Sequence, residues 1–387
     1  MKIAVLKETQ TGERRVALVP ESCKKLIQAG YTISIEKRAG EAAFYSDEMY
    51  QEVGCTVEQD PATMIGSSDI VLKVNPPAIT TANRNEVEWM KPGTVLLASL
   101  MPLRYLDVVH QLATHDITAF STDAIPRTTR AQAMDTLSSM ANIVGYKGVL
   151  LAASELSKYF PMFITAAGTV LPAKVFVIGA AVSGLQAIAT ARRLGANVTA
   201  TDVRPEVKEQ IESLGAKYVG IELKESASAG GGYARELSQE DKLKQRELLA
   251  EQCTVVDIII TTALIGGVFA PKLITAEMVK KMRPGSVIVD LGADGGGNCE
   301  LSKPGETVMS HGVKIIAPLN LPSTMPTHAS LLFSRNLTAF VQTFTKDKKF
   351  QLDFSDDIQK GSIITHHGEI LNARTKEALK TPRPEGS

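Results

Sequence analysis

The sequence has few cysteines and no excess of either charge. It contains four cysteines in 387 residues, and none of them forms a C-x-x-C pair; they are Cys23, Cys55, Cys253 and Cys299. This spacing suggests neither a zinc site nor a disulfide framework, and it fits a reducing compartment. The 42 Lys and Arg residues balance 42 Asp and Glu residues. No summed field therefore favours nucleic acid or an anionic membrane surface as a partner.

Long apolar runs are also missing. The first residues, MKIAVLKETQTGERR, become charged by Lys7 and lack the apolar core of a signal peptide. The two most apolar stretches, residues 175–191 and 255–267, are interrupted by polar residues such as Ser183 and Thr261. Neither stretch is expected to span a bilayer, and we expect a cytoplasmic protein.

Short β-branched runs alternate with amphipathic stretches in two successive series. The first series runs from KIAVL through the helix-like PESCKKLIQAG and TISIEK to DITAFS, and the second runs from KVFVIG to VKIIA. Such alternation is typical of βαβ units around a parallel sheet. The sequence therefore predicts an α/β fold with two Rossmann-like, doubly wound parallel-sheet domains.

Two helix-like segments predict where the chain passes from one domain to the other. Residues 131–160 contain no proline and are long enough for one helix that joins two lobes, and a second helix is expected after Pro326. The second helix would return the chain to the first lobe. We expect a discontinuous first domain of residues 1–137 and 322–387, a nucleotide-binding domain of residues 138–321, and a cofactor cleft between them.

The segment VIGAAVSG predicts a dinucleotide-binding turn, although it departs from the usual Gly-x-Gly-x-x-Gly pattern. It follows a predicted strand and precedes a predicted helix, and alanine occupies the middle glycine position. A further strand ends at Asp202, about 20 residues later, where an acid binds the adenine ribose hydroxyls. We predict that this site binds NAD(H), although Arg204 leaves a 2′-phosphate conceivable. The predicted cofactor-binding residues here are Gly179, Ala181, Val182, Gly184, Asp202 and Val203.

Several motifs together resemble one known family. FITAAGTVLPAKV, the turn itself, GLQAIATARRLGANVTATDVRPEVKEQIESLGAKYV and NLPSTMPTHASLLFSRNLTAF are similar to the NAD(H)-binding component, domain I, of proton-translocating nicotinamide nucleotide transhydrogenase. The similarity extends from Met1 to about residue 370. Alanine dehydrogenase belongs to the same fold family and shares ETQTGERRVALVP and the strand around Lys73.

The resemblance implies catalytic residues in PRTTRAQAMDTLSS. Its motif positions correspond to Arg127, Gln132 and Asp135, with Ser138 on the same helical face as Asp135. An arginine, an amide and a carboxylate beside a helix start can bind a carboxamide, a ribose hydroxyl and a pyrophosphate. From spacing alone, a helix cap with salt bridges would be the favoured interpretation, and the resemblance reverses that preference.

The expected hydride acceptor is another nucleotide. Reduction of a 2-oxo acid also moves a proton and needs a placed acid or base, whereas transfer between nucleotides needs none. Alanine dehydrogenases carry a histidine where Met101 stands here, and the six histidines of this chain lie on helices, before a strand or near the terminus. Arg15 and Lys73, which face the substrate carboxylate in those dehydrogenases, keep an alanine dehydrogenase alternative open. A nucleotide-sensing module without chemistry is a third possibility.

Two further segments are expected near the cofactor. Residues 222–238 are long for a simple connection and contain three hinge glycines followed by Tyr233, which matches a mobile-loop tyrosine of the resembled family. TTALIGG follows a buried strand and should face the crevice, with Leu264 as the preferred contact. No metal site is predicted.

The resemblance implies that this chain supplies one of the two nucleotide sites that the reaction needs. The chain would hold NADH and donate its hydride to NADP⁺ on a separate NADP(H)-binding subunit, with proton movement through membrane-spanning subunits. It would form a homodimer and lie at the membrane only through its partners.

Overall fold

The computed structural model describes residues 1–79, 84–221, 237–264 and 270–380. The chain divides into two compact units, the first made of Met1–Met140 and Pro322–Ser387 and the second of Ala141–Leu321. The boundary after Met140 lies inside helix α5 (Thr136–Glu155), which also contains the boundary that the sequence predicts after residue 137.

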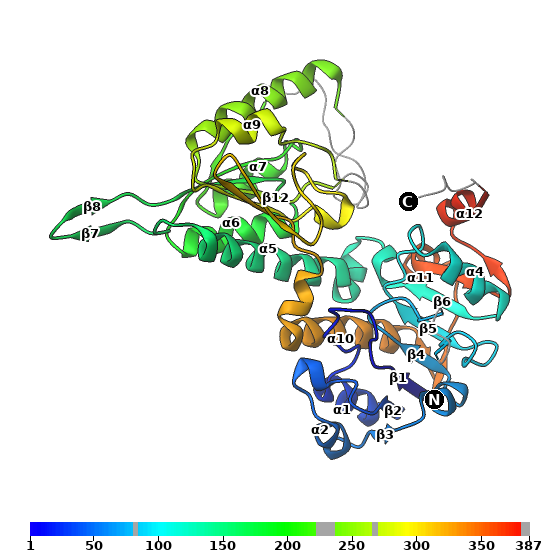
Figure 1. Ribbon diagram of the computed structural model, residues 1–387. Coiled ribbons are helices and arrows are strands. Elements are labelled where there is room, and N and C mark those ends of the chain that lie inside the picture. The colour runs from blue at the N-terminus through cyan, green and yellow to red at the C-terminus, as the bar shows by residue number, and fades with distance from the viewer. Residues whose placement is uncertain (80–83, 222–236, 265–269, 381–387) are drawn as a thin grey trace. The chain divides into compact units, whose positions relative to one another are not determined.

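The first unit is built on a mainly parallel sheet with the strand order β3-β2-β1-β4-β5-β6-β18-β19 (Figure 1). Its parallel strands are β1 (Lys2–Val5), β2 (Thr32–Glu36), β3 (Thr56–Glu58), β4 (Ile70–Leu72), β5 (Val95–Ala98) and β6 (Thr118–Ser121). The edge strands β18 (Ile363–His366) and β19 (Glu369–Ile370) pair in the antiparallel direction. The order β3-β2-β1-β4-β5-β6 is that of a doubly wound nucleotide-binding fold, with a switch point between β1 and β4.

Alternate residues of the central strand explain why both faces of this sheet are covered. In β1, Ile3 and Val5 enter one apolar core, whereas Ala4 and the following Leu6 enter the other. The covering helices are α1 (Pro20–Gln28), α2 (Asp47–Glu52), α3 (Pro61–Gly66), α4 (Leu106–Thr114), α10 (Pro326–Thr343), α11 (Asp357–Ser362) and α12 (Ala373–Lys380). A small hairpin of β16 (Thr345–Lys346) and β17 (Lys349–Phe350) follows α10.

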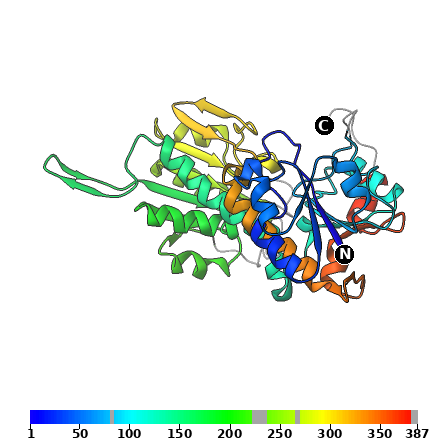
Figure 2. The ribbon, with the colours of Figure 1, turned by 90° about the horizontal axis from the view of Figure 1, so that it is seen from below.

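Helix α10 lies beside α1 in the first unit, as Figure 2 shows. Two hydroxyls of α10 accept backbone N–H groups that precede α1: Ser330 from Val16 at 3.0 Å and Ser334 from Val19 at 3.1 Å. These buried bonds satisfy donors that no strand partner reaches. The segment after residue 321 is therefore part of the core of the first unit.

The second unit repeats the same topology. Its strand order is β11-β10-β9-β12-β13-β15-β14, in which only the edge strand β14 (Thr307–Ser310) is antiparallel. The parallel strands are β9 (Lys174–Ile178), β10 (Asn197–Thr201), β11 (Lys217–Tyr218), β12 (Ile258–Thr261), β13 (Val287–Asp290) and β15 (Val313–Ile316). Helices α6 (Val182–Arg193), α7 (Val207–Ser213), α8 (Gln239–Val255) and α9 (Ala276–Lys281) accompany them. The predicted α/β class with two parallel-sheet domains is confirmed.

An arm of the second unit is absent from the sequence prediction. Strands β7 (Phe163–Thr165) and β8 (Gly168–Val170) form an antiparallel hairpin that projects from the body of the unit (Figure 1). Every residue of its two strands is exposed, so they lack the buried β-branched runs by which the other strands are predicted. Among the described residues, no helix combines the length and apolarity needed to cross a membrane.

Candidate nucleotide site

The glycine turn lies at the switch point of the second sheet, between β9 and α6. Gly179 has a φ of 91°, a left-handed conformation that a side chain would disfavour. Gly184 lies so close to the end of β9 that a β-carbon there would be 1.8 Å from the carbonyl oxygen of Gly179. The two outer glycines of the motif are therefore required by geometry, and the predicted turn is formed.

The middle position of the motif is Ala181, and it caps α6 without a side-chain acceptor. The amides of a first helical turn have no partner within the helix, and a side-chain cap normally satisfies some of them. Here the small side chain leaves them to an external acceptor. A pyrophosphate at a helix N-terminus fits this arrangement, with Val182 as the first residue of the helix.

Asp202 follows β10 and faces the same turn. Its carboxylate accepts the N–H of Ala180 at 2.8 Å and the N–H of Arg204 at 2.9 Å. The guanidinium of Arg204 adds two more hydrogen bonds, each of 2.9 Å, to the two carboxylate oxygens. The predicted ribose acid is thus placed beside the glycine turn, and the adjoining Val203 is half-buried.

Two further residues contact the glycine turn or the segment after β12: Thr262, which lies in the TTALIGG segment that the sequence placed at the crevice, and Asn298, which the sequence analysis did not name. The hydroxyl of Thr262, directly after β12, donates to the carbonyl of Gly179 at 3.0 Å. The buried amide of Asn298 accepts the N–H of Ala263 at 3.1 Å and donates to the carbonyls of Ala263 and Pro271, each at 2.9 Å. Since Asn298 is distant in sequence, no local pattern could have indicated this contact.

The residues expected to be catalytic lie around the start of α5 in the first unit. Asp135 precedes the helix. Its carboxylate accepts hydrogen bonds from the backbone N–H of Ser138 at 2.8 Å and from the hydroxyl of Ser138 at 2.6 Å. This is the geometry of a helix N-cap. Arg127 and Gln132 are exposed, and Gln132 lies in a 3₁₀ turn (Thr129–Met134) that packs against α10.

The switch point of the first sheet contains a buried ion-pair network. Lys73, after β4, is 3.1 Å from Glu86 and 3.5 Å from Glu8, which follows β1. Arg15 forms a two-bond contact with Glu13, at 2.8 and 2.7 Å. All three acidic side chains are buried. The cations that would face a substrate carboxylate in a dehydrogenase therefore have carboxylate partners within this chain.

The pKa values in this network follow from burial and pairing. Burial alone would raise the pKa of Glu13, but hydrogen bonds from Arg15 and Ser323 lower it to about 2. For Glu8, burial dominates and the pKa is raised despite the nearby ammonium of Lys73. The network thus keeps Glu13 ionised at neutral pH.

Comparisons with known proteins agree with this architecture. The family model of the alanine dehydrogenase/PNT N-terminal domain matches residues 4–144, and that of the alanine dehydrogenase/PNT C-terminal domain matches residues 148–373. The chain belongs to the alanine dehydrogenase/PNT family. The resemblance that the sequence motifs indicated is confirmed.

Within this family, the chain is more similar to transhydrogenase alpha subunits than to alanine dehydrogenases. It is 45% identical to the first part of the NAD(P) transhydrogenase alpha subunit of Rhodospirillum rubrum, over 96% of this chain and 98% of the relative. A transhydrogenase structure from Sinorhizobium meliloti matches with a TM-score of 0.86 and 40% identity, over 96% of this chain and all of that one. The alanine dehydrogenase of Halomonas elongata is 29% identical over 98% of this chain and 97% of the relative.

Met101 occupies the position at which the alanine dehydrogenase branch of the family was expected to carry a histidine. Its N–H donates to the carboxylate of Asp123 at 3.2 Å, and its φ is 43°. Burial raises the pKa of Asp123, whose carboxylate also accepts the hydroxyl of Ser121 at 2.6 Å. Asp123 is therefore engaged in holding the turn after β5.

Some family positions lie outside the described residues or close to their limits. Tyr233 and the three glycines before it are outside the described ranges. Leu264 is half-buried and directly precedes undescribed residues, so its contact with a nicotinamide stays a prediction. Among the residues that the structure describes, no group of three His, Cys, Asp or Glu side chains could hold a metal.

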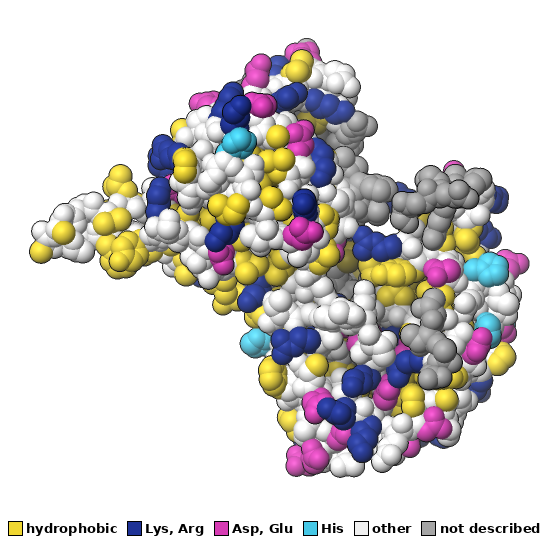
Figure 3. All heavy atoms as spheres, in the orientation of Figure 1, with side chains coloured by type: hydrophobic (Ala, Val, Ile, Leu, Met, Phe, Trp, Pro, Cys, Tyr) yellow, Lys and Arg dark blue, Asp and Glu magenta, His cyan; other side chains and the backbone are white. Residues whose placement is uncertain are grey.

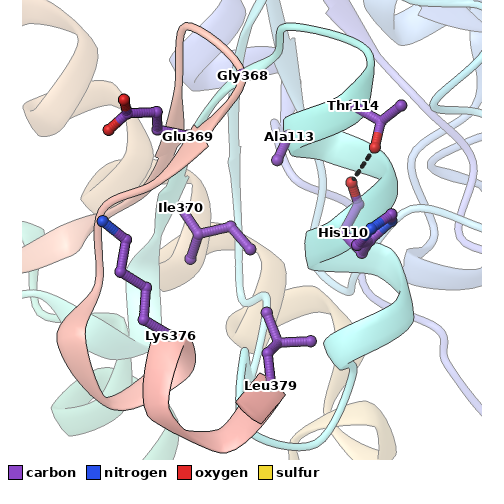
Figure 4. Close-up of a pocket in the computed structure, with 8 residues that line it drawn as sticks. All are labelled: His110, Ala113, Thr114, Gly368, Glu369, Ile370, Lys376 and Leu379. Carbon is purple, nitrogen blue, oxygen red and sulfur yellow. Dashed lines mark hydrogen bonds between the residues drawn. The ribbon is translucent and has the colours of Figure 1, made fainter.

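A separate groove of about 500 Å³ lies on the first unit between α4, the β18–β19 turn and α12 (Figure 4). His110, Glu369 and Lys376 line it together with the apolar Leu379. The hydroxyl of Thr114 donates to the carbonyl of His110 at 2.9 Å, within the helix. None of the predicted site residues lines this groove.

Proposed function

We propose that this chain is the NAD(H)-binding component of a proton-translocating transhydrogenase. It donates hydride from NADH to NADP⁺ on a separate NADP(H)-binding subunit, and membrane-spanning subunits couple the transfer to proton movement. The observation that carries this proposal is the pairing of Arg15 and Lys73 with Glu13, Glu8 and Glu86. This pairing leaves the family's nucleotide site intact but occupies the cations that a dehydrogenase needs for its substrate carboxylate.

The chain's own residues bind and orient the dinucleotide in this proposal. The first turn of α6 binds the pyrophosphate, Gly179 and Gly184 allow the close approach, and Asp202 binds the adenine ribose. NADH supplies the hydride from C4 of its dihydronicotinamide ring. Gln132 and Arg127 orient the ring, and Asp135 fixes the start of α5 beside them, so they act by position rather than by proton transfer.

A homodimer is part of the proposal, and the hairpin of β7 and β8 supports it. Ile164 and Leu171 are 77% and 76% exposed, and Met162 and Phe163 are also exposed. Figure 3 shows hydrophobic side chains at the surface of this arm. Contiguous apolar side chains on a projecting arm are typical of subunit contacts. We expect that Ile164→Asp together with Leu171→Asp yields a monomer in sedimentation at micromolar concentration. An unchanged dimer would place the interface elsewhere.

The transfer reaction tests the proposal. The purified chain is mixed with an NADP(H)-binding transhydrogenase component, and transfer from NADH to an NADP⁺ analogue is followed spectroscopically. Gln132→Asn is expected to slow the transfer far more than it weakens NADH binding, because it shortens a side chain that orients the ring. Gln51→Asn, at an exposed position of α2, is the matched control and should change neither. Equal loss of transfer and binding in Gln132→Asn would make Gln132 an ordinary binding residue.

An alanine dehydrogenase is the second candidate, because Arg15 and Lys73 are both present. Alanine-dependent reduction of NAD⁺ by the isolated chain would establish that activity. A nucleotide-sensing module is distinguished by saturable NADH binding without hydride exchange, even when the NADP(H)-binding component is present.

A further inference from the structure

The carboxylate of Asp202 has no acceptor capacity left in this structure. One oxygen accepts the backbone N–H and the Nε–H of Arg204, each at 2.9 Å. The other accepts the N–H of Ala180 at 2.8 Å and an Nη–H of Arg204 at 2.9 Å. A carboxylate offers about four lone-pair positions, and four donors occupy them.

Ribose hydroxyls can reach this carboxylate only if one of its donors moves away. The N–H of Ala180 belongs to the glycine turn, where the residue is 1% exposed. The N–H of Arg204 is fixed by the backbone of the turn after β10, which is also held by the bond from the Tyr218 hydroxyl to the carbonyl of Asp202 at 3.1 Å. The side chain of Arg204 is the mobile member of the set, because it can rotate without moving the backbone.

A guanidinium beside the ribose position is also the group best suited to bind a 2′-phosphate. Its planar array of donors matches a phosphate in two-bond geometry. In this chain the same donors are directed at Asp202. An intact carboxylate therefore both engages the guanidinium and repels the phosphate.

We propose that Arg204 is a specificity-determining residue of this nucleotide site: it is a phosphate-binding group that Asp202 holds in an ion pair, so loss of the carboxylate directs the site toward 2′-phosphorylated nucleotides. This inference rests on the proposed NAD(H) site. It assigns the preference for NAD(H) to the pair of residues rather than to Asp202 alone.

Other charged groups near the pair do not remove this role. Hydrogen bonding to Asp202 raises the pKa of the Arg204 guanidinium, and the charge of Glu206 adds to that effect. Lys208 is a further cation in the neighbourhood, with its ammonium 5.9 Å from the centre of the Tyr218 ring. The experiment must therefore separate Arg204 from Lys208.

The test compares NADH and NADPH affinities of the full chain by calorimetry. Asp202→Asn keeps an oxygen for the Ala180 N–H but removes the charge, and we expect the NADPH affinity to rise about tenfold or more. Arg204→Gln added to Asp202→Asn should abolish that gain. Lys208→Gln added to Asp202→Asn is the matched control and should retain it. Thermal unfolding of each variant checks that it is folded.

The possible outcomes separate this inference from the proposed function. Failure of the wild-type chain to bind NADH would refute the proposed function, and the inference with it. Wild-type binding of NADH without an NADPH gain in Asp202→Asn would overturn only the inference, as would a gain that survives Arg204→Gln. If Asp202→Asn does not fold, Arg204→Gln alone decides: the weak NADPH affinity should fall relative to that for NADH, and an unchanged ratio contradicts the proposal.

Discussion

Replacement of Gly184 by alanine tests the close contact between helix α6 and the end of strand β9. The added β-carbon would lie 1.8 Å from the carbonyl oxygen of Gly179 and 3.3 Å from the hydroxyl of Thr262. Real contacts of a β-carbon are essentially never shorter than 3.0 Å, so the helix or the turn must move by more than 1 Å. The obstructing atom belongs to the backbone of the turn itself, which rules out relief by rotation of a side chain.

The expected magnitude follows from this displacement. Overpacking of a tight site typically costs about 1–3 kcal/mol, which corresponds to a loss of NADH affinity of about 5- to 150-fold if the strain falls on the binding turn. The stability of the second unit should fall as well, because Gly184 is buried against β9. The first unit, which has its own core, should be unaffected.

Calorimetric titration with NADH and thermal unfolding measure both effects. Gly66→Ala is the matched control, because a β-carbon at Gly66 in helix α3 meets its nearest atom at 3.4 Å, an ordinary contact. It should leave NADH binding unchanged and stabilise α3 slightly through the higher helix propensity of alanine. Unchanged NADH affinity in Gly184→Ala would refute the assignment of this turn as the pyrophosphate site.

Three further predictions concern the buried networks. Glu13→Gln should lower the free energy of unfolding at pH 7 by about 3 kcal/mol, because the pKa of Glu13 is about 2 in the folded chain and 4.5 ordinarily. In urea titrations, the difference in unfolding free energy between the wild type and this variant should shrink as the pH falls from 4.5 toward 2. A difference that does not change with pH would contradict the pKa argument. Lys73→Met removes the ammonium that lies between the carboxylates of Glu8 and Glu86, so that the buried Glu8 loses its cation while Glu86 keeps its ion pair with Arg84. This change should cost about 3–5 kcal/mol in urea unfolding, and a neutral effect would show that the ion pairs of Lys73 are dispensable. Asn298→Ala removes hydrogen bonds to the backbone of Ala263, so it should lower the free energy of unfolding by about 1–3 kcal/mol and weaken NADH binding. The control Asn142→Ala changes an exposed asparagine and should have neither effect. Equal effects of the two variants would show that Asn298 is not part of the site.

The sequence predicted those parts of the fold that depend on local pattern. Strands of a parallel sheet that are buried on both faces form continuous apolar runs, as in the IVL of β4 and the VIV that begins β13, and such runs are visible without a structure. The glycine turn was equally visible, because Gly179 and Gly184 are required by backbone geometry at fixed spacing.

Contacts between distant segments were not predictable in this way. The hydrogen bond between the Asn298 side chain and the backbone of Ala263 joins residues that only the fold brings together, and so does the ion pair of Lys73 and Glu86. The exposed hairpin of β7 and β8 was missed because its apolar residues lack a buried face to set their period.

The Asp135 cap shows how one residue supports two interpretations. An aspartate three residues before Ser138 predicts a helix cap from spacing alone, and the structure contains that cap. The family resemblance adds a role in orienting the nicotinamide. The two roles are compatible, because a cap fixes the start of the helix on which an orienting group depends.

The central claim is that hydride passes from NADH on this chain directly to another nucleotide. The most direct measurement supplies [4,4-²H₂]NADH to the chain together with the NADP(H)-binding component, NADP⁺, pyruvate and ammonium, and follows the deuterium by mass spectrometry. The account predicts deuterium at C4 of NADPH, none lost to water, and none in alanine. Deuterium at Cα of alanine, with unlabelled NADP⁺ remaining, would contradict it.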